Sequence, residues 1–291
     1  MNNRNILIAV QTFNGLNYTK NTFKSIKDQD TFHNIYFFVI DNSSTDGTIE
    51  WLIQNNINHQ ILNPRQCSAT GMNRCLTYFY TNPNYDYLIL LNNDVYIYPN
   101  FIETIVKDFE NQNNILPGCL LMCGVQTTKI NDKQRRAIKK QELQDIEDEV
   151  MSGDYSAFII SKDVIDKVGY FDERFSPRYI EDNDYTHRIY LSGGYCIRNG
   201  KCLFDHELGA IFKIQQEPKS NIPKDSANAI MVNNAIKYKK KWGSYPKGLS
   251  RPISIFAMIA ENQNGFIFIG IIILTGMIIR KKSKIKDVKI D

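Results

Sequence analysis

The stretch YLILLNND, residues 87–94, decides the fold class. Five apolar or aromatic side chains come first, and Asn92, Asn93 and Asp94 follow them directly. A short, continuous apolar run of this kind is typical of a strand that is buried on both faces. Its polar ending predicts a strand that stops at the carboxyl edge of a sheet, where open α/β sheets bind their ligands.

Two similar apolar runs, residues 6–10 and 35–40, precede this strand, and helix-like stretches separate the three. We expect strands and helices to alternate, which predicts an α/β fold with a Rossmann-like, mostly parallel sheet flanked by helices. Further along we expect a strand at 155–160 and a helix that begins at Glu181. The other expected elements are helices at 16–28, 70–80 and 225–242, a strand at 59–62, and a helix capped by an oxygen of residues 43–46.

Polar side chains follow three of the expected strands. They lie at residues 12–14 (Thr-Phe-Asn), 41–43 (Asp-Asn-Ser) and 92–94 (Asn-Asn-Asp). Each cluster alone is compatible with ordinary turn residues. Because parallel strands end at the same edge of a sheet, we expect the three clusters to lie close together and to form one site.

The composition matches a soluble globular protein, with 43% hydrophobic and 23% charged residues in 291. The net charge is only +4 and the basic residues are scattered, so we expect no nucleic-acid partner. Six cysteines contain no C-x-x-C pair, and the first apolar run is too short for a secretory signal. These features predict free thiols and a cytoplasmic location.

Two groups of side chains are candidates for chemistry. Asn92 and Asp94 present oxygen ligands at a strand end, as Mg²⁺ and Mn²⁺ prefer, and such ions also bind substrate phosphates. Glu181 and Asp182 begin a helix, where a carboxylate can act as a general base or simply cap the helix. His206 is either a surface residue or a nitrogen ligand for the same metal.

Four motifs in this order resemble glycosyltransferase family 2. They are TFN at 12–14, VIDNSSTDGT at 39–48, LLNNDV at 90–95, and GYFDERF followed by DNDYTHR within 169–188. The resemblance covers roughly residues 5–210, and its specificity lies in the order of the motifs rather than in any one of them. It implies a GT-A fold and inversion at the anomeric carbon of a nucleoside-diphosphate sugar. The helix expected at 225–242 adds a C-terminal helical extension to this fold.

The resemblance also assigns roles to residues. It places Thr12, Phe13 and Asp41 at the nucleotide base, Asn92 to Asp94 at the metal, and Asp182 as the base, with Glu181 as second choice. His206 resembles the histidine that completes the metal site, which holds Mn²⁺ or Mg²⁺. We further expect Asn14, Arg65, Asn73 and Asn93 to contact the nucleotide sugar.

The implied function is transfer of a sugar from a UDP or dTDP donor to a hydroxyl of a glycan or lipid-linked acceptor. Residues 1–215 would form the catalytic domain, with the nucleotide-sugar half at 1–98 and the acceptor half at 99–215. Residues 216–250 would form a helical extension and 251–291 an apolar and basic tail. The oligomeric state is not predicted.

Two departures from the family pattern keep alternatives open. Asn92 replaces the first aspartate of the D-x-D motif, and Arg65 stands where a glycine is usual. A non-catalytic scaffold that binds nucleotide sugars, and a sugar nucleotidyltransferase, are the competing functions. A dinucleotide-binding oxidoreductase is excluded because the turn after the first strand lacks G-x-G-x-x-G.

The tail is of a different character from the rest of the chain. Residues 265–279 carry no charge, and five basic residues follow within 280–286. Fifteen residues are too few to span a bilayer, which needs about 20. The segment 265–286 is therefore expected either to contact the cytoplasmic face of a membrane peripherally or to pack within the protein.

Overall fold

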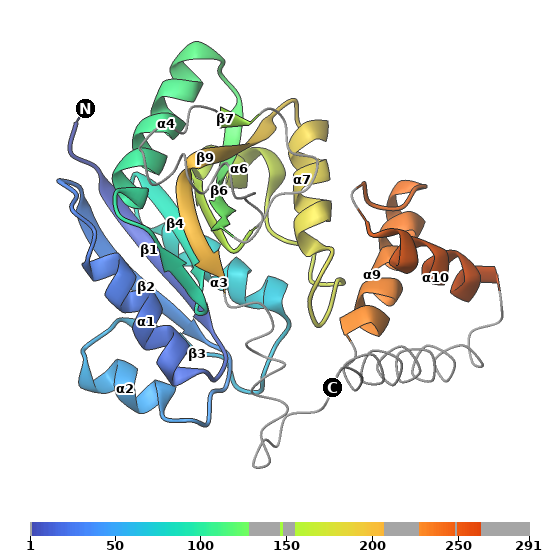
Figure 1. Cartoon of the computed structure of the whole chain (residues 1–291), viewed down its shortest axis with the longest axis horizontal. Helices are drawn as coiled ribbons and strands as arrows, with labels where there is room; N and C mark the ends of the chain where they lie inside the picture. The colour runs from blue at the N-terminus through green and yellow to red at the C-terminus, as the bar shows by residue number, and fades with distance from the viewer. Residues whose placement is uncertain (1, 128–145, 148–154, 207–226, 248, 263–291) are drawn as a thin grey trace, which may run out of the picture. The chain divides into compact units, whose positions relative to one another are not determined.

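The computed structural model describes residues 2–127, 146–147, 155–206, 227–247 and 249–262. The chain divides into two compact units, Met1–Lys224 and Asp225–Asp291. The first unit is an α/β domain and the second is helical in its described part (Figure 1).

One sheet forms the centre of the first unit. Its strands lie in the order β3-β2-β1-β4-β8-β6-β9-β5, and β7 pairs with β9. The strands are β1 (Asn5–Thr12), β2 (Asn34–Asp41), β3 (His59–Ile61), β4 (Tyr87–Asn92), β5 (Val95–Ile97), β6 (Cys119–Gln126), β7 (Ile146–Glu147), β8 (Ala157–Ile160) and β9 (Tyr195–His206).

The sheet is parallel across its first half and mixed beyond it. Strands β3, β2, β1 and β4 are all parallel to their neighbours in this half. Strand β8 lies antiparallel between β4 and β6, and β5 is antiparallel to β9. The register places Thr12 opposite Asp41 and Gln11 opposite Asn92. Three strand ends are thereby aligned at one edge.

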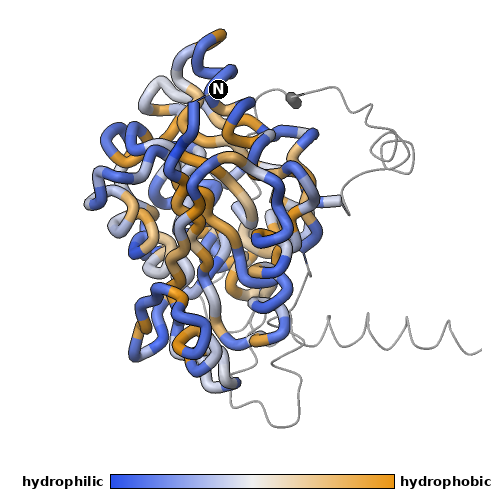
Figure 2. The backbone as a smooth tube through the Cα atoms, turned by 90° about the vertical axis from the view of Figure 1, so that its left-hand side faces the viewer, coloured by the Kyte–Doolittle hydropathy of each residue, from blue (hydrophilic) through white to orange (hydrophobic). Residues whose placement is uncertain are grey.

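Helices cover both faces of the sheet (Figure 1). Ile6, Ile8 and Val10 of β1 belong to one buried cluster, and Leu7 and Ala9 belong to the other, because successive side chains of a strand point to opposite faces. The first cluster includes α1 (Leu16–Lys27), α2 (Thr48–Gln54) and α4 (Phe101–Ile115); the second includes α3 (Ser68–Thr81), α6 (Lys162–Val168) and α7 (Glu181–Leu191). Figure 2 shows hydrophobic strands running through the interior of this unit.

The expected alternation of strands and helices is confirmed along residues 5–97. The expectation that an oxygen of residues 43–46 caps the next helix is met by Asp46, although Asp46 is not the N-cap residue. Helix α2 begins at Thr48 after Gly47, whose φ is 93°, and no side chain caps it at the N-cap position. The Asp46 carboxylate still accepts the Thr48 backbone N–H at 3.2 Å, and the Ser44 hydroxyl accepts the Asn14 N–H instead. Asp46 therefore bonds the start of α2, whereas Ser44 joins its own loop to the loop that follows β1.

The second unit contains α9 (Ala227–Trp242) and α10 (Arg251–Asn262) among its described residues. Helix α9 matches the helix expected at 225–242, whereas α10 lies in residues that were expected to form the tail. The two helices pack through Val232 and Ala235 of α9 and Ile253 and Ala257 of α10. None of the helices in the described parts of the chain combines the length and hydropathy needed to cross a bilayer. The segment 265–286 lies outside the described residues.

Candidate active site

The turn after β1 is fastened to the end of β4 by the side chain of Asn93. Its Nδ2 donates to Thr12 Oγ1 at 3.0 Å, to the Asn14 carbonyl at 2.9 Å and to Thr19 Oγ1 at 3.2 Å. The Asn93 carbonyl in turn accepts from Thr22 Oγ1 at 2.8 Å. The side-chain amide of Asn93 therefore bonds the loop of Phe13 and the helix that follows it, and holds that loop in place.

Asn14 joins the first and second strand ends. Its backbone has a φ of 54°, a left-handed conformation that asparagine tolerates better than most residues. The Asn14 N–H donates to Ser44 Oγ at 2.7 Å, and its Oδ1 accepts the Thr45 N–H at 2.8 Å. Asn14 and Asn93 together hold three loops in one arrangement.

Asp41 is a buried carboxylate with an incomplete set of partners. Its Oδ1 accepts the Ser44 N–H at 2.8 Å, whereas Oδ2 has no hydrogen-bond partner among the described residues. Burial raises the pKa of this carboxyl above its ordinary value, and the hydrogen bonds from Ser44 partly oppose that shift. A buried acceptor without a partner is costly, so Asp41 is suited to accept a hydrogen bond from a bound N–H group.

Arg65 stacks on Phe13. The guanidinium carbon lies 3.8 Å from the centroid of the Phe13 ring, and both side chains are half-buried. The loop that carries Arg65 is held by Asn42, whose Oδ1 accepts the Gln66 N–H at 2.7 Å and whose Nδ2 donates to the Gln66 carbonyl at 2.9 Å. Arg65 is thus placed beside the loop of Phe13 instead of extending freely from the surface.

Asp94 and His206 meet where β5 begins and β9 ends. Asp94 Oδ1 lies 3.1 Å from His206 Nε2, and their side chains are 12% and 17% exposed. His206 Nδ1 is 3.3 Å from Ser156 Oγ, and the Ser156 carbonyl accepts the Asn92 N–H at 3.0 Å. The pairing of Val95 with His206 sets this corner, and it brings Asn92, Asp94 and His206 to one end of the sheet.

The donor set at this corner fits a divalent cation such as Mn²⁺. One carboxylate oxygen and one imidazole nitrogen are already adjacent and reachable by solvent, and Mn²⁺ accepts both kinds of ligand. Ser156 contacts the other ring nitrogen of His206, which is how metal-binding histidines are usually oriented. No cluster of three or more His, Cys, Asp or Glu suited to a metal occurs in the described part of the chain, so further ligands would be Asn92, water or phosphate.

Helix α7 begins after a strained turn. Tyr179 and Ile180 have φ values of 73° and 75°, and a β-branched residue in this left-handed region is rare. Such strain is common where surrounding packing holds a functional group in place. Glu181 and Asp182 follow immediately as the first two residues of α7.

The two carboxyls differ in their surroundings. Glu181 is 7% exposed, and burial, with a smaller contribution from the charge of Asp182, raises its pKa to about 8. Its Oε2 has no partner among the described residues, while the Ser68 hydroxyl hydrogen-bonds the carboxyl. Asp182 is half-buried, and its Oδ1 accepts the Asn183 N–H at 2.8 Å. Burial therefore favours the protonated form of Glu181.

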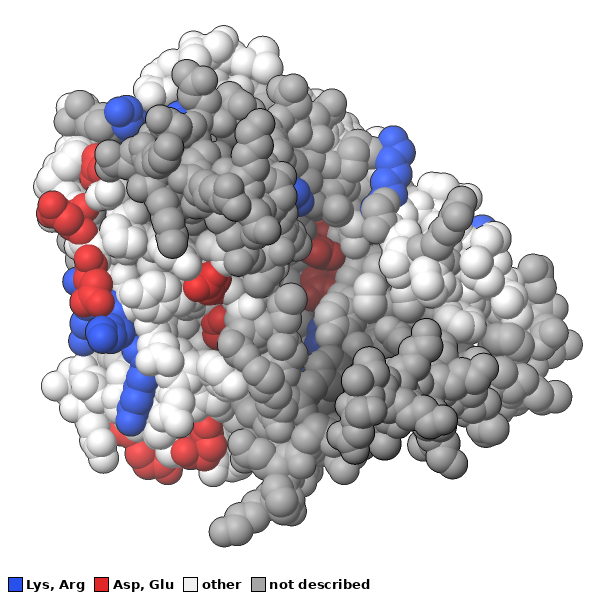
Figure 3. Space-filling view, viewed as in Figure 1, with Lys and Arg blue, Asp and Glu red and all other residues white. Residues whose placement is uncertain are grey.

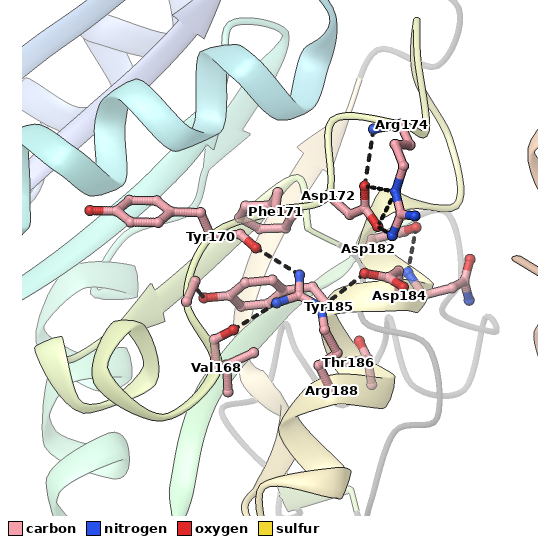
Figure 4. A network of polar contacts seen from close by, with 12 residues as sticks. Val168, Tyr170, Phe171, Asp172, Arg174, Asp182, Asp184, Tyr185, Thr186 and Arg188 are labelled. Carbon is pink, nitrogen blue, oxygen red and sulfur yellow. Dashed lines mark hydrogen bonds and ion pairs between the residues drawn. The ribbon is translucent and has the colours of Figure 1, made fainter. Parts of the chain in front are cut away.

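A network behind α7 holds the preceding segment, residues 168–174, against the helix (Figure 4). Arg188 donates to Asp184 at 2.9 Å, to the Val168 carbonyl at 2.7 Å and to the Tyr170 carbonyl at 2.8 Å. The rings of Phe171 and Tyr185 stack with centroids 4.1 Å apart. Asp184, the third acid of the run, is thus engaged in holding this segment rather than placed to act as a base.

The model of one family, described as glycosyl transferase family 2, matches residues 7–169, which is more than half of the chain. The chain belongs to glycosyl transferase family 2. It is therefore a glycosyltransferase, and the fold expected from the four motifs is confirmed. No curated protein sequence matches the chain.

Solved structures place this glycosyltransferase among proteins of the GT-A fold. A mannosyltransferase from Pyrobaculum calidifontis, solved in complex with GDP-Man and Mn²⁺, is similar with a TM-score of 0.56 and 14% identity, over 96% of this chain and 81% of that one. TarS from S. aureus is similar with a TM-score of 0.52 and 14% identity; the match covers 87% of this chain and 45% of TarS. At this identity the likeness concerns the fold alone.

The structure brings most of the expected site residues of the glycosyltransferase to one edge of its sheet. Asn73 is differently engaged: its Nδ2 donates to the Phe171 carbonyl at 3.0 Å and to Glu173 at 2.9 Å, and its Oδ1 accepts the Phe171 N–H at 2.7 Å. Its amide is thus occupied by the segment before α7.

Acidic side chains appear at several places on the face of the molecule in Figure 3.

Sequence reasoning missed the residues that connect the strand end beside Asp94 and His206 to α7. Gln11, paired with Asn92, donates from Nε2 to the Ser68 carbonyl at 3.2 Å, and the Ser68 hydroxyl bonds Glu181. A Cβ at Gly71 would lie 2.5 Å from Gln11 Nε2, so a side chain there would require the end of the Gln11 side chain to move. Gln11 precedes the motif at 12–14, but nothing in the sequence pairs it with Ser68.

Proposed function

We propose that this glycosyltransferase moves a sugar, with inversion at the anomeric carbon, from a UDP or dTDP sugar to a hydroxyl of a glycan or lipid-linked acceptor. The observation that carries the proposal is the contact between Asp94 and His206 at the edge where the strands of the nucleotide-binding half end. Family membership favours glycosyl transfer over the sugar nucleotidyltransferase and scaffold alternatives.

The donor base is proposed to lie between Asp41 and the loop of Phe13. A uracil or thymine ring has one N–H that can donate to Asp41 Oδ2, which lacks a partner among the described residues. Phe13 offers an aromatic face, which Arg65 covers in this structure. When a nucleotide binds, Arg65 is proposed to turn toward the diphosphate, because a guanidinium can pair with phosphate oxygens through two parallel hydrogen bonds.

Asp94 and His206, with Asn92 beside them, are proposed to hold a divalent cation. A cation here would offset the negative charge that grows on the departing nucleoside diphosphate. The mannosyltransferase with a similar fold was solved with Mn²⁺, which supports manganese as the first ion to test. The replacement of the usual first aspartate by Asn92 leaves this corner with one negative charge fewer.

Asp182 is proposed as the general base. It is partly exposed and therefore accessible to an acceptor, whereas Glu181 is buried and its pKa is raised, which favours its protonated form. In the step itself, the acceptor hydroxyl gives its proton to an Asp182 oxygen as its own oxygen bonds to the anomeric carbon. The bond from that carbon to the diphosphate breaks with its electron pair, and the nucleoside diphosphate leaves.

The test is release of nucleoside diphosphate from a panel of nucleotide sugars with Mn²⁺ and candidate glycan acceptors. Asp182→Asn should lower kcat by about a hundredfold or more and leave donor affinity within about twofold, because a general base contributes roughly 10² to 10⁴. Glu181→Gln, the matched control, should stay within about tenfold of wild type. A wild-type protein that binds a donor but releases no diphosphate with any acceptor would favour the scaffold.

A further inference from the structure

The second helix of the C-terminal unit is apolar on both of its sides. Ile253 and Ala257 of α10 are buried against α9, with 5% and 0% exposure. On the other side, Ile255 and Met258 are 48% and 45% exposed, and Pro252 is exposed one turn before them. These three residues recur every third position, so they form one stripe along the helix.

An exposed apolar stripe of this kind is a candidate contact surface for another molecule. Single exposed apolar residues are normal on soluble proteins, whereas neighbouring ones on one helix form a patch that is available to another molecule. The packing between α9 and α10 already accounts for the buried side of α10. The exposed stripe is therefore available for a contact other than the packing of α10 against α9.

The charge of the C-terminal unit indicates which partner. Residues 225–291 contain twelve Lys and Arg and four Asp and Glu, a formal charge of +8. Since the whole chain is +4, residues 1–224 carry −4. Lys237, Lys240 and Lys247 are exposed, while Glu261, the acid that the described residues of this unit contain, is paired with Lys239 at 2.6 Å.

We propose that the stripe of Pro252, Ile255 and Met258 on α10 docks onto the interface of an anionic lipid membrane. Exposed apolar side chains on a helix of a unit with a net positive charge are the chemistry that such a surface takes up. The sequence after α10 has a similar composition, since residues 265–279 carry no charge and five basic residues occur in 280–286. The proposed acceptor can be lipid-linked, but this inference does not depend on the reaction.

Two other partners fit less well. A nucleic acid would use the lysines, but it has no use for an aliphatic stripe without aromatic side chains to stack on bases. A second copy of this chain could cover the stripe, but it would bring two units of charge +8 together. Vesicle flotation distinguishes both of these partners from a membrane.

The test is flotation of the full-length protein with vesicles of phosphatidylcholine, with and without phosphatidylserine. The wild type should float with the anionic vesicles, less so with neutral ones, and less as salt is raised. Ile255→Gln/Met258→Gln, which keeps good helix formers, should weaken binding about tenfold. Lys240→Gln/Lys247→Gln should weaken binding to the anionic vesicles only.

The matched control is Asn228→Gln/Asn233→Gln on the exposed side of α9, which should bind as the wild type does. Because flotation needs no donor or acceptor, its failure is distinct from failure of the proposed function. The proposal is overturned if the wild type does not float, or if the Ile255→Gln/Met258→Gln protein floats equally well. Binding to duplex DNA without flotation, or a dimer that this variant dissociates without flotation, also overturns it.

Discussion

Asp94 Oδ1 lies 3.1 Å from His206 Nε2, although Asp94, in the turn between β4 and β5, is far in sequence from His206, the last residue of β9. The antiparallel pairing of β5 with β9 creates this contact by placing Val95 opposite His206. A carboxylate and an imidazole held this close can hydrogen-bond each other or share a cation. The contact therefore defines the corner at which metal dependence should be sought.

Asp94→Asn should weaken Mn²⁺-dependent donor binding by about tenfold or more, because it removes the one formal negative charge proposed for the metal. Calorimetric titration of the donor with and without Mn²⁺ measures this. Asp205→Asn is the matched control: it lies next to His206, makes the same change in charge, and contacts Tyr98 and Thr127 instead. Equal donor affinity of wild type and Asp94→Asn in both conditions would remove Asp94 from the metal site.

Arg65 and Phe13 should be energetically coupled. A guanidinium 3.8 Å above an aromatic ring is worth about 0.5 to 2 kcal/mol, depending on its exposure. A double-mutant cycle with Arg65→Ala and Phe13→Leu, measured as the free energy of unfolding, should give a coupling energy in that range. Arg65→Lys should also raise the donor KM, because lysine lacks the planar fork. Strict additivity with an unchanged KM would make Arg65 a surface residue.

Much of the fold could be predicted from residue patterns, and the reason is local. The runs at 6–10, 35–40 and 87–91 are apolar and largely buried, so their sequences alone identify them as strands. The contact of Asp94 with His206 depends on the partner of β5, which no local pattern encodes. The residues alone left His206 as either a surface residue or a metal ligand, and the family resemblance added support for the ligand.

The antiparallel position of β8 between β4 and β6 could not be predicted from the sequence either. Its residues 157–160 are apolar and fully compatible with a parallel neighbour. The engagement of Asn73 by the 171–173 segment illustrates the same limit, since a polar side chain on a helix looks alike whether it faces a ligand or a loop. Side-chain roles depend on the partner that folding supplies.

Asn73→Ala should cost stability first and donor affinity only as a consequence. It leaves the Phe171 N–H and carbonyl without their partner, which costs about 1 to 3 kcal/mol in the free energy of unfolding. Urea denaturation measures this cost, and Asn233→Ala at an exposed position of α9 provides the comparison. A variant as stable as wild type but with a strongly raised donor KM would instead place Asn73 in the nucleotide-sugar site.

Glu181 should make the protein less stable as the pH rises from about 4.5 to about 8. Its ordinary pKa is 4.5 and burial raises it to about 8, so between these values the folded protein holds a proton that the unfolded chain releases. The stabilising contribution of the protonated carboxyl is complete below the lower value and is lost as the pH passes through the upper one. Glu181→Gln removes this dependence, because an amide stays neutral throughout.

The difference in unfolding free energy between Glu181→Gln and wild type should therefore move in favour of the variant by more than about 1 kcal/mol from pH 5 to pH 8, since one unit of pKa shift corresponds to about 1.4 kcal/mol. Urea denaturation at the two pH values gives this difference, and all other titrating groups are common to both proteins. A constant difference would mean that Glu181 is ionised in the folded state. Asp182 would then lose its electrostatic advantage over Glu181 as the base, and the kinetics of Asp182→Asn alone would have to decide between them.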